Sequence, residues 1–421
     1  MSKEIKNIAV IGSGISGIVA SYLLQDRYDV NLFEKNNYIG GHTNTIRVKE
    51  GESGLPVDTG FIVFNDRTYP VFTRFLSRLG VSSQDSDMSF SYYNKAKNVM
   101  YSSDVPNGLF ADRRNIVNLS FYRMFADIAR FNKTAKKDFE EGRLGEITLG
   151  EYLQRGQYGE PFINYYFVPA AAAIWSAPSA KIMDFPCETF IRFYKNHGIL
   201  DLGLGVQWKT IAGGSQTYVR AFLESFKGTV HTSRGAVGIE RKDKVNIYLS
   251  DGSLRAYDAV VIAAHADQAL NLLKDPTDRE KRLLGPWRYS KNDTVLHKDK
   301  GRMPRSMRAW TSWNYIQDEK GDAESPVSLT YYMNRLQRLR SKDKYFVSLN
   351  QSNMIQRDKV VYETVYEHPR YDFSSMNTQP DLDSLNGVNN TYFCGSYFGY
   401  GFHEDGARSA VLACEKLGVS L

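Results

Sequence analysis

The chain has 421 residues, of which 42% are hydrophobic, 24% charged and 13% aromatic. This length exceeds a single small core and suits two domains, and the composition excludes a disordered or membrane-spanning protein. The 53 basic and 47 acidic residues give a net charge of +6. Because the basic residues form no strong stripe, we expect no nucleic-acid partner, and an anionic small molecule or membrane surface suits the sign better.

Cysteine and histidine patterns exclude two further classes of protein. Cys187, Cys394 and Cys414 are widely separated and odd in number, which predicts neither a disulfide framework nor a CxxC metal pair. The seven histidines form no HxxxH or HExxH motif, so we expect no metal. The chain enters a predicted strand at Asn7 without room for a signal peptide, and its longest mostly apolar stretch, 167–175, is too short to cross a bilayer. We therefore expect a cytoplasmic protein that is at most peripheral to the inner face of the membrane.

The first predicted elements form half of a doubly wound nucleotide-binding unit. An apolar strand at 7–11 is followed by Gly12, Gly14 and Gly17, then by an apolar helix, and a second strand ends at Glu34. The three glycines suit a tight turn, a close approach to a pyrophosphate, and helix–strand packing. The helix start, with Ile15 and Ser16, offers free N–H groups to a phosphate, and Glu34 can accept the ribose hydroxyls of adenosine.

The middle of the chain predicts a helix-rich insertion. Residues 69–79 have a helical pattern, and 115–137 forms a longer helical candidate with apolar residues at helical spacing and basic residues around them. Two interpretations of the longer helix stay open: it packs on a core as part of a cap, or it lies on a membrane surface.

The second half of the chain returns to the nucleotide-binding pattern. Paired strands are predicted within 230–250, and the fully apolar run 258–264 is typical of a buried parallel strand. An excursion at 290–375 suggests an antiparallel sheet with strands at 307–315, 327–333 and 345–349. A strand at 391–394, a glycine-broken segment with a helix start near Gly406, and a helical run at 407–417 follow.

The residues after Glu34 distinguish FAD from NAD. Gly40, Gly41 and His42 follow at short range, and here the sequence resembles the FAD-dependent amine oxidase superfamily, which also holds phytoene desaturases and protoporphyrinogen oxidase. The segment 392–410 resembles the second flavin motif of that superfamily, in which a helix start stabilises the reduced flavin.

The resemblance implies a fold and a cofactor site. It implies an α/β fold in which an FAD-binding Rossmann-like (glutathione reductase-type) domain, residues 1–60, 226–288 and 380–421, is interleaved with an α+β substrate domain, residues 61–225 and 289–379, which carries a mostly antiparallel sheet and a helical cap. FAD is expected to bind non-covalently, because Cys394 lies inside a strand. The implied cofactor-binding residues are Gly12, Gly14, Ile15, Ser16, Gly17, Glu34, Lys35, Gly40, Gly41, His42, Thr59, Gly60, Phe61, Val237, Gly395, Ser396, Glu404, Asp405 and Gly406.

Further motifs narrow the resemblance. The segments 57–65, 196–198, 213–218, 287–290, 295–297 and 399–406 look like those of bacterial predicted flavoproteins often encoded beside cyclopropane-fatty-acid-synthase-type methyltransferases. By analogy this implies oxidation of a lipid acyl chain, for example desaturation of a methylated fatty acyl chain, with a lipid methyltransferase as a candidate partner. His42 departs from the arginine common in amine oxidases, and no counterpart of their active-site lysine is found.

Three residues are candidates for catalysis. His403 or Glu404 is expected to handle the proton released when a substrate hydride passes to flavin, although a structural role for His403 stays open. Tyr400, with Tyr397, is a candidate aromatic wall or a packed side chain. His197 and His297 are left open, whereas His231, His265 and His368 are interpreted as structural.

Three functions compete on this evidence. The first is an FAD-dependent dehydrogenase of a fatty acyl chain, working on lipid with the basic helix near an anionic membrane. The second is an amine oxidase acting on a soluble amine. The third is a non-catalytic flavin-binding partner of a lipid methyltransferase.

Overall fold

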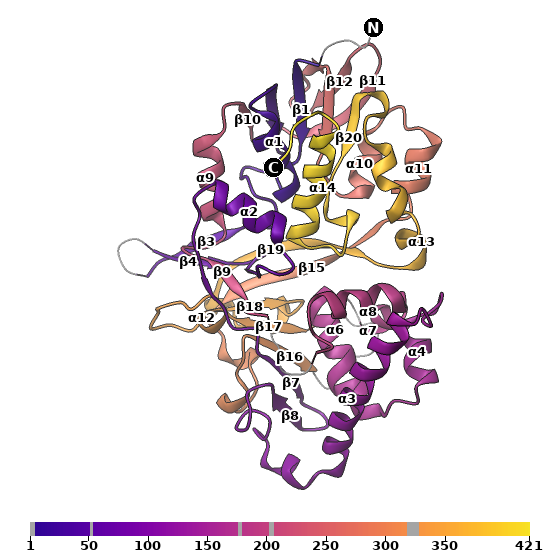
Figure 1. Cartoon of the computed structure of the whole chain (residues 1–421). Coiled ribbons are helices and arrows are strands. Elements are labelled where there is room, and N and C mark those ends of the chain that lie inside the picture. Colours follow the sequence, from indigo (N-terminus) through magenta and orange to yellow (C-terminus); the bar gives the residue numbers. More distant parts are fainter. Residues whose placement is uncertain (1–4, 51–53, 176–178, 202–205, 318–327) are drawn as a thin grey trace.

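The computed structural model describes residues 5–50, 54–175, 179–201, 206–317 and 328–421. Figure 1 shows two lobes: an upper lobe that contains β1, α1 and α14, and a lower lobe that contains α3, β7 and β8. The chain passes between the lobes more than once, so that each is built from segments far apart in the sequence.

A parallel sheet forms the centre of the upper lobe. Its strands, in order, are β10 (Thr229–His231), β2 (Asp29–Phe33), β1 (Asn7–Ile11), β14 (Ala259–Ile262) and β20 (Thr391–Phe393), and every neighbouring pair is parallel. Side chains of β1 alternate between the two faces, with Ile8 and Val10 in one core and Ala9 and Ile11 in the other. Both faces are covered, as the apolar strands predict.

Helices cover one face of this sheet and a small sheet covers the other. The helices are α1 (Ile15–Leu24), α2 (Pro70–Arg78), α9 (Gln216–Ser225) and α14 (His403–Glu415). The second face packs on the antiparallel strands β11 (Ala236–Arg241), β12 (Val245–Leu249) and β13 (Leu254–Tyr257), with α10 (Ala266–Leu272) and α11 (Asp278–Leu284). The sequence-based domain division places α2 and α9 in the substrate domain, whereas their buried side chains belong to the core of the upper lobe.

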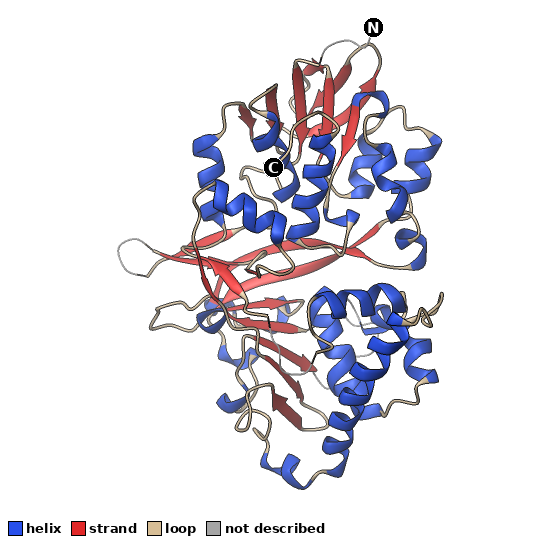
Figure 2. Ribbon diagram, in the orientation of Figure 1, coloured by secondary structure: helices blue, strands red, loops and turns tan. Residues whose placement is uncertain are grey.

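A seven-stranded sheet connects the lobes. Its order is β19 (Val360–Arg370), β15 (Arg288–His297), β18 (Phe346–Leu349), β17 (Leu329–Tyr332), β16 (Trp313–Gln317), β7 (Phe90–Asn94) and β8 (Val99–Ser102), antiparallel except between β16 and β7. Figure 2 shows the long pair β15–β19 crossing the junction between the lobes. This mostly antiparallel sheet, with the parallel sheet above it, confirms the α/β fold class expected from the sequence.

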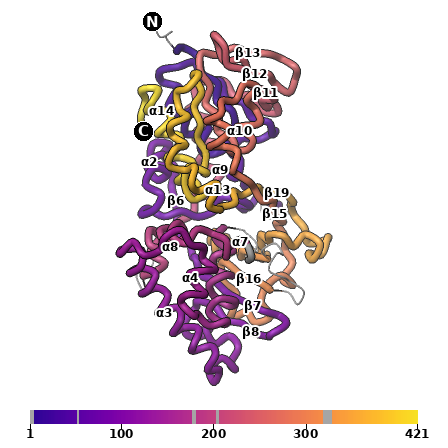
Figure 3. The backbone as a smooth tube through the Cα atoms, turned by 90° about the vertical axis from the view of Figure 1, so that its right-hand side faces the viewer, coloured from indigo at the N-terminus to yellow at the C-terminus, as the bar shows by residue number. Residues whose placement is uncertain are grey.

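A layer of helices packs beside this sheet and forms the cap. It consists of α3 (Leu119–Glu140), α4 (Leu149–Arg155), α5 (Glu160–Phe162), α6 (Val168–Trp175), α7 (Ser179–Met183) and α8 (Cys187–Asn196), and Figure 3 shows it in the lower lobe. The remaining short elements are β3 (Thr45–Val48) with β4 (Leu55–Asp58), β5 (Val63–Phe64) with β9 (Lys209–Ile211) and β6 (Ser83–Asp85), α12 (Met333–Leu336) and α13 (Phe373–Met376).

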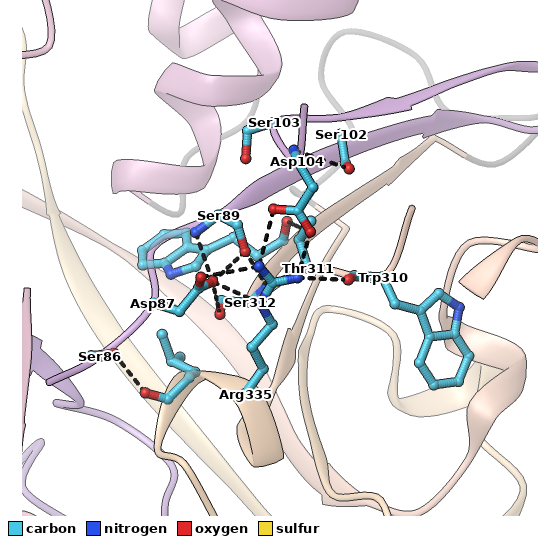
Figure 4. Close-up of polar contacts among 12 residues, drawn as sticks. Ser86, Asp87, Ser89, Ser102, Ser103, Asp104, Trp310, Thr311, Ser312 and Arg335 are labelled. Atoms are coloured by element: carbon cyan, nitrogen blue, oxygen red, sulfur yellow. Dashed lines mark hydrogen bonds and ion pairs between the residues drawn. The ribbon is translucent and has the colours of Figure 1, made fainter. Parts of the chain in front are cut away.

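An ion cluster fixes the loops at one edge of the large sheet. Arg335, in α12, binds Asp104 at 2.7 Å and Asp87 at 2.9 Å, and its guanidinium also donates to the Trp310 carbonyl. Ser312, which directly precedes β16, also donates a hydrogen bond to Asp87, as Figure 4 shows. One guanidinium therefore joins three segments that are distant in the sequence.

Three expected elements begin three or more residues away from the start that the sequence predicts. The helix expected at 115–137 runs from Leu119 to Glu140, because Asn118 caps its N-terminus through Ser120 N. The strand expected from residue 307 begins at Trp313, since Ser306 caps a short 3-10 turn at Met307–Ala309. The helix expected to start near Gly406 begins at His403. Within the described ranges, no helix is long and apolar enough to span a bilayer.

Candidate cofactor and active site

The glycine loop between β1 and α1 leaves open space at only one of its three glycines. A Cβ on Gly12 would lie 2.5 Å from the Ala263 carbonyl oxygen, and one on Gly17 would lie 1.8 Å from the Gly12 oxygen. Around a Cβ on Gly14, by contrast, no heavy atom lies within 4 Å. No side chain caps the α1 N-terminus, which starts at Ile15 and Ser16. The loop therefore presents a helix N-terminus with room for a phosphate group beside Gly14.

Glu34 is fixed at the end of β2, beside this loop. Its carboxylate accepts hydrogen bonds from Ser13 N at 3.0 Å, Ser13 Oγ at 2.6 Å and Asn36 N at 2.9 Å, and the residue is 5% exposed. The following Lys35 packs against Gly235, where a Cβ would lie 2.8 Å from Lys35 Cβ. The carboxylate is thus held beside the glycine loop by the hydrogen bonds from Ser13 and Asn36.

Val237 offers its backbone rather than its side chain. The side chain is 61% exposed, and the β11–β12 register shifts between Ala236 and Gly238, which leaves Val237 outside the ladder. A bulge of this kind frees an N–H and a carbonyl for a ligand such as an adenine edge.

The segment after Glu34 folds back onto the glycine loop. Gly41, at φ +59°, would place a Cβ 3.1 Å from Gly14 Cα, and Gly40, at φ +128°, donates its N–H to the Ser13 carbonyl at 3.0 Å. Phe61 N donates to the His42 carbonyl at 2.8 Å, and a Cβ on Gly60 would lie 2.1 Å from that same oxygen. The segment 40–42 and the segment 57–65 are therefore in direct backbone contact with each other.

The C-terminal motif brings a second helix N-terminus to the same place. Gly395 follows β20 and donates to Ser409 Oγ at 2.9 Å, and Ser396 begins the next 3-10 turn. A Cβ on Gly406 would lie 2.8 Å from both Ile15 Cγ2 and Ser16 Oγ, so α14 packs closely against the start of α1. The sequence predicts both glycine motifs, and the structure joins them in one site.

Comparison with known proteins identifies this arrangement. The family model of flavin containing amine oxidoreductases matches residues 15–293. The chain belongs to this family. FAD is accordingly its cofactor.

Proteins similar to this chain carry different names. A curated L-amino-acid oxidase from Siganus canaliculatus is 23% identical over 350 residues, which cover 77% of this chain but only 62% of that protein. Among solved structures, a CLA-producing fatty acid isomerase from P. acnes matches with a TM-score of 0.71 and 15% identity over 99% of both chains. Cyclohexylamine oxidase from Brevibacterium oxydans IH-35A matches with a TM-score of 0.67 and 13% identity over 99% of this chain and all of the other. These structural matches show a shared fold.

The residues of the site at the two helix N-termini fit FAD. The open side of Gly14 suits the pyrophosphate, and the bulge at Val237 suits the adenine. His42 Nε2 is buried without a hydrogen-bond partner, which is costly unless a ligand supplies one. Cys394 is buried, and burial raises the pKa of its thiol to about 12, so it is a poor nucleophile for a flavin tether and non-covalent binding is favoured.

His42 lies in a group of imidazoles that the sequence does not reveal. Its ring stacks on Tyr366 at 5.0 Å between centroids, with His368 at 5.4 Å and His265 at 6.4 Å. Burial, followed by the neighbouring imidazoles, lowers the pKa of His368 to about 3, and burial with His42 and Lys35 lowers that of His265 to about 3. The cluster is therefore neutral at physiological pH.

His265 and His368 were expected to be structural, and they are far from His42 in sequence. They reach His42 because β14 and β19 converge on the loop after Gly41. Asn292 Nδ2 contacts His368 Nδ1 at 3.0 Å and thereby orients that ring. No local spacing signals this contact, since three separate segments create it.

His403 lies at the start of α14 with its ring against Phe61. The two rings stack at 3.5 Å between centroids with 10° between their planes. Its Nε2 lies 3.0 Å from Thr43 Oγ1 and 3.2 Å from Tyr218 OH, and these two oxygens are 2.6 Å apart. Burial lowers the pKa of His403 well below its usual range, so the imidazole is neutral. Thr43 and Tyr218 are site residues that the candidate list lacks, although Tyr218 ends the segment 213–218.

Glu404 and Asp405 hold neighbouring backbone. Glu404 accepts hydrogen bonds from Val71 N at 3.1 Å and Phe72 N at 2.9 Å, which caps α2. Asp405 accepts from Tyr400 N at 2.9 Å and Phe402 N at 3.0 Å. Burial raises the pKa of both, that of Asp405 to about 6. These bonds fix the segment before α14, and both oxygens of the Glu404 carboxylate accept from backbone N–H groups.

An aromatic wall connects the flavin motif to the cap. Phe402 stacks on Phe193 of α8 at 5.2 Å, and Tyr400 meets Phe193 edge-on at 5.4 Å. Trp175 lies 4.7 Å from Phe193, and His197 lies 3.9 Å from it. Burial lowers the pKa of His197 to about 4, so the wall carries no imidazolium.

The other open candidates are placed more simply. Tyr397 is buried and packs against Trp287 at 5.6 Å between centroids. His297 is fully buried within the large sheet, where Nε2 meets Ser348 Oγ at 2.8 Å and Nδ1 accepts from Asp299 N at 3.0 Å. Both nitrogens of His297 are therefore used inside the protein. In the described part of the chain no group of three or more His, Cys, Asp or Glu residues is arranged to hold a metal ion.

Proposed function

We propose that the protein dehydrogenates an apolar substrate, a fatty acyl chain of a lipid that is methylated in the preferred case. The observation that carries the proposal is the aromatic wall of Trp175, Phe193, Tyr400 and Phe402 between cap and flavin motif. Burial of apolar surface against such side chains favours a hydrocarbon.

The charges nearby argue against a cationic substrate. An amine brought into this site would need a carboxylate partner, because an unpaired buried charge is costly. The two carboxylates closest in sequence to the wall, Glu404 and Asp405, are already bound to backbone N–H groups. The wall therefore suits a neutral chain better than an ammonium group.

The protein's own residues divide the remaining tasks. FAD, when bound, supplies the acceptor for a hydride from a substrate C–H bond. Formation of the C=C bond also releases a proton from the adjacent carbon, and neutral His403 is the residue proposed to receive it. Thr43 and Tyr218 orient the His403 ring through Nε2, and Phe61 holds its face.

Anaerobic reduction of the FAD-loaded protein tests this proposal. Phospholipids with methylated or unmethylated acyl chains are mixed with it in one series, and small primary amines in another. Loss of visible flavin absorbance with lipid alone, together with a lipid product that lacks two hydrogens, supports the proposal.

Two other outcomes would overturn it. Reduction by amines alone would assign the protein to the amine oxidases, which its family model also accommodates. If neither series reduces the flavin while the protein binds a lipid methyltransferase, a non-catalytic partner role replaces the enzymatic one.

A further inference from the structure

The outer end of the cap gathers apolar side chains that face solvent. Six of the fourteen large hydrophobic side chains exposed in the described part of the chain lie at 105–122 and 307. Val117 is 83% exposed, Val105 75%, Leu119 74% and Met307 66%, with Ile116 and Tyr122 near one half. Single exposed apolar residues are common, whereas a concentration of them marks an interaction surface.

These residues lie on segments that pack together. Tyr122 OH donates to the Ile116 carbonyl at 2.9 Å, and Ala111 shares a small core with Ala309 and Met100. Figure 1 shows the segment between β8 and α3 at the bottom of the lower lobe, away from the parallel sheet. We name this end of the molecule, residues 103–123 with 305–309, the cap tip.

The charge of the cap tip is strongly positive. It carries exposed arginines at five positions, namely Arg113, Arg114, Arg123, Arg305 and Arg308. Its acids are Asp112, which pairs with Arg114 and Arg305, and Asp104, which pairs with Arg335 outside the tip. Arg113, Arg123 and Arg308 have no ion-pair partner among the residues that the structure describes.

Beyond its first turn, α3 has ion pairs on its exposed side and a buried apolar face. Farther along the helix, Arg130 pairs with Asp127 at 2.8 Å and Lys136 pairs with Asp201 at 2.8 Å. Its apolar face, with Met124 and Phe131, is buried in the lower lobe. Ion pairs therefore neutralise part of the basic character of the helix beyond the tip, whereas Lys133 and Lys137 stay exposed without an ion pair among the described residues.

We propose that the cap tip docks on the surface of an anionic lipid bilayer. Apolar side chains flanked by unpaired arginines match a bilayer surface, in which headgroup phosphates lie above the hydrocarbon. The apolar residues lie on the 3-10 turns Arg113–Val117 and Met307–Ala309, on the start of α3 and on the loop after β8, and the unpaired arginines Arg113, Arg123 and Arg308 lie on or next to the same elements. Docking in this way would leave the FAD-binding lobe facing away from the membrane. The inference does not depend on which substrate the flavin site oxidises.

Vesicle flotation with the FAD-loaded full chain tests the proposal. Phosphatidylcholine vesicles that contain phosphatidylglycerol are compared with vesicles of phosphatidylcholine alone, at low and at high salt. We expect binding to the anionic vesicles that weakens as salt is added. Because each arginine near such a surface is worth about fivefold in binding, Arg113→Gln with Arg123→Gln should reduce the partition coefficient roughly 25-fold.

A second pair of substitutions tests the apolar contribution. Val117→Ser with Leu119→Ser should reduce the partition coefficient at least about tenfold without changing the net charge. One control serves both pairs: Arg279→Gln with Leu254→Ser, which removes one exposed arginine and one 55% exposed leucine from the other lobe. It should bind like the unchanged protein. Flavin content and melting temperature, which should be unaffected, show that each variant is folded.

The following results would overturn the proposal. Equal binding to neutral and anionic vesicles, absence of binding at low salt, or tip variants that float like the control would each contradict it. If the tip variants instead convert a dimer to a monomer in light scattering while vesicle binding is unchanged, the tip is an interface between copies of the chain.

Discussion

Replacing Gly14 by alanine should separate cofactor binding from folding. The residue has φ −66° and ψ −179°, a conformation that alanine adopts without strain, and nothing lies within 4 Å of the added methyl group. The methyl group would, however, fill the space into which a pyrophosphate must come. The companion change, Gly17→Ala, places its methyl carbon 1.8 Å from the Gly12 oxygen inside the folded protein.

The expected magnitudes differ accordingly. For the protein without FAD, Gly14→Ala should change the free energy of unfolding by no more than about 1 kcal/mol, in the stabilising direction if the unfolded chain loses entropy. Its FAD dissociation constant should rise about 30-fold or more, which is a loss of about 2 kcal/mol. Gly17→Ala should cost about 3 kcal/mol of stability, because backbone atoms cannot move aside.

Urea denaturation of the FAD-free variants measures the first quantity, and FAD titration followed by flavin fluorescence measures the second. The control is Ala221→Gly, which removes one methyl group from a half-buried position of α9 away from the site. Gly80→Ala is less suitable because Gly80 has φ +67°, which strains alanine. If Gly14→Ala binds FAD with unchanged affinity, or unfolds as readily as Gly17→Ala, the assignment of the open side of Gly14 to the pyrophosphate is wrong.

Three further predictions concern charge and proton transfer. Burial raises the pKa of Asp405 from 3.8 to about 6, so protonation of this acid stabilises the folded state fully below pH 3.8, and the contribution, up to about 3 kcal/mol, is lost as pH rises through 6. Urea denaturation at pH 4 and pH 7 should therefore show a smaller loss of unfolding free energy in Asp405→Asn than in the unchanged protein, and equal losses would contradict the reasoning. His403→Gln should lower the rate of flavin reduction about 100-fold or more with little change in FAD affinity. Because the pKa of His403 lies well below 6.5, the rate of flavin reduction by the unchanged protein should show no step near pH 6.5. Arg335→Gln leaves Asp87 and Asp104 facing each other without a cation and should cost about 1 to 2 kcal/mol in urea denaturation, a modest value because all three side chains are partly exposed; a change within error would show that solvent already screens them.

Local motifs allowed much of the site to be predicted. The roles of Gly12, Gly14 and Gly17 follow from their spacing between a strand and a helix, and contacts among neighbours in sequence fix them in the structure. The position of Glu34 could also be predicted, since the strand that ends at this residue lies beside the glycine loop in any doubly wound sheet.

The start of α14 shows where local reasoning fell short although a signal existed. Acidic residues at Glu404 and Asp405 are typical of the first turn of a helix, and Asp405 accepts the Phe402 N–H in the manner of a capping residue. Weight given to Gly406 as a breaker placed the start three residues late. The glycine is required instead by its contact with Ile15 and Ser16, which only the tertiary structure shows.

Other parts of the site have no sequence signal. The cluster of His42, His265 and His368 is assembled by β14, β19 and a loop, so no spacing along the chain reveals it. The cap tip also has no sequence signal, because the exposure of Leu119 depends on which side of α3 faces the core, and that of Val117 on how the preceding 3-10 turn packs.

The packing of α14 against α1 has a consequence for synthesis of the protein. The first helix N-terminus of the cofactor site is complete within the first 24 residues, but β20 and α14, which close the site, are made only when the ribosome reaches residues 391–415. Because the parallel sheet takes β20 as an edge strand, beside β14, FAD meets a finished site only after β20 and α14 have been made and have folded onto the earlier strands. The first half of the upper lobe therefore forms before the half that completes its cofactor site.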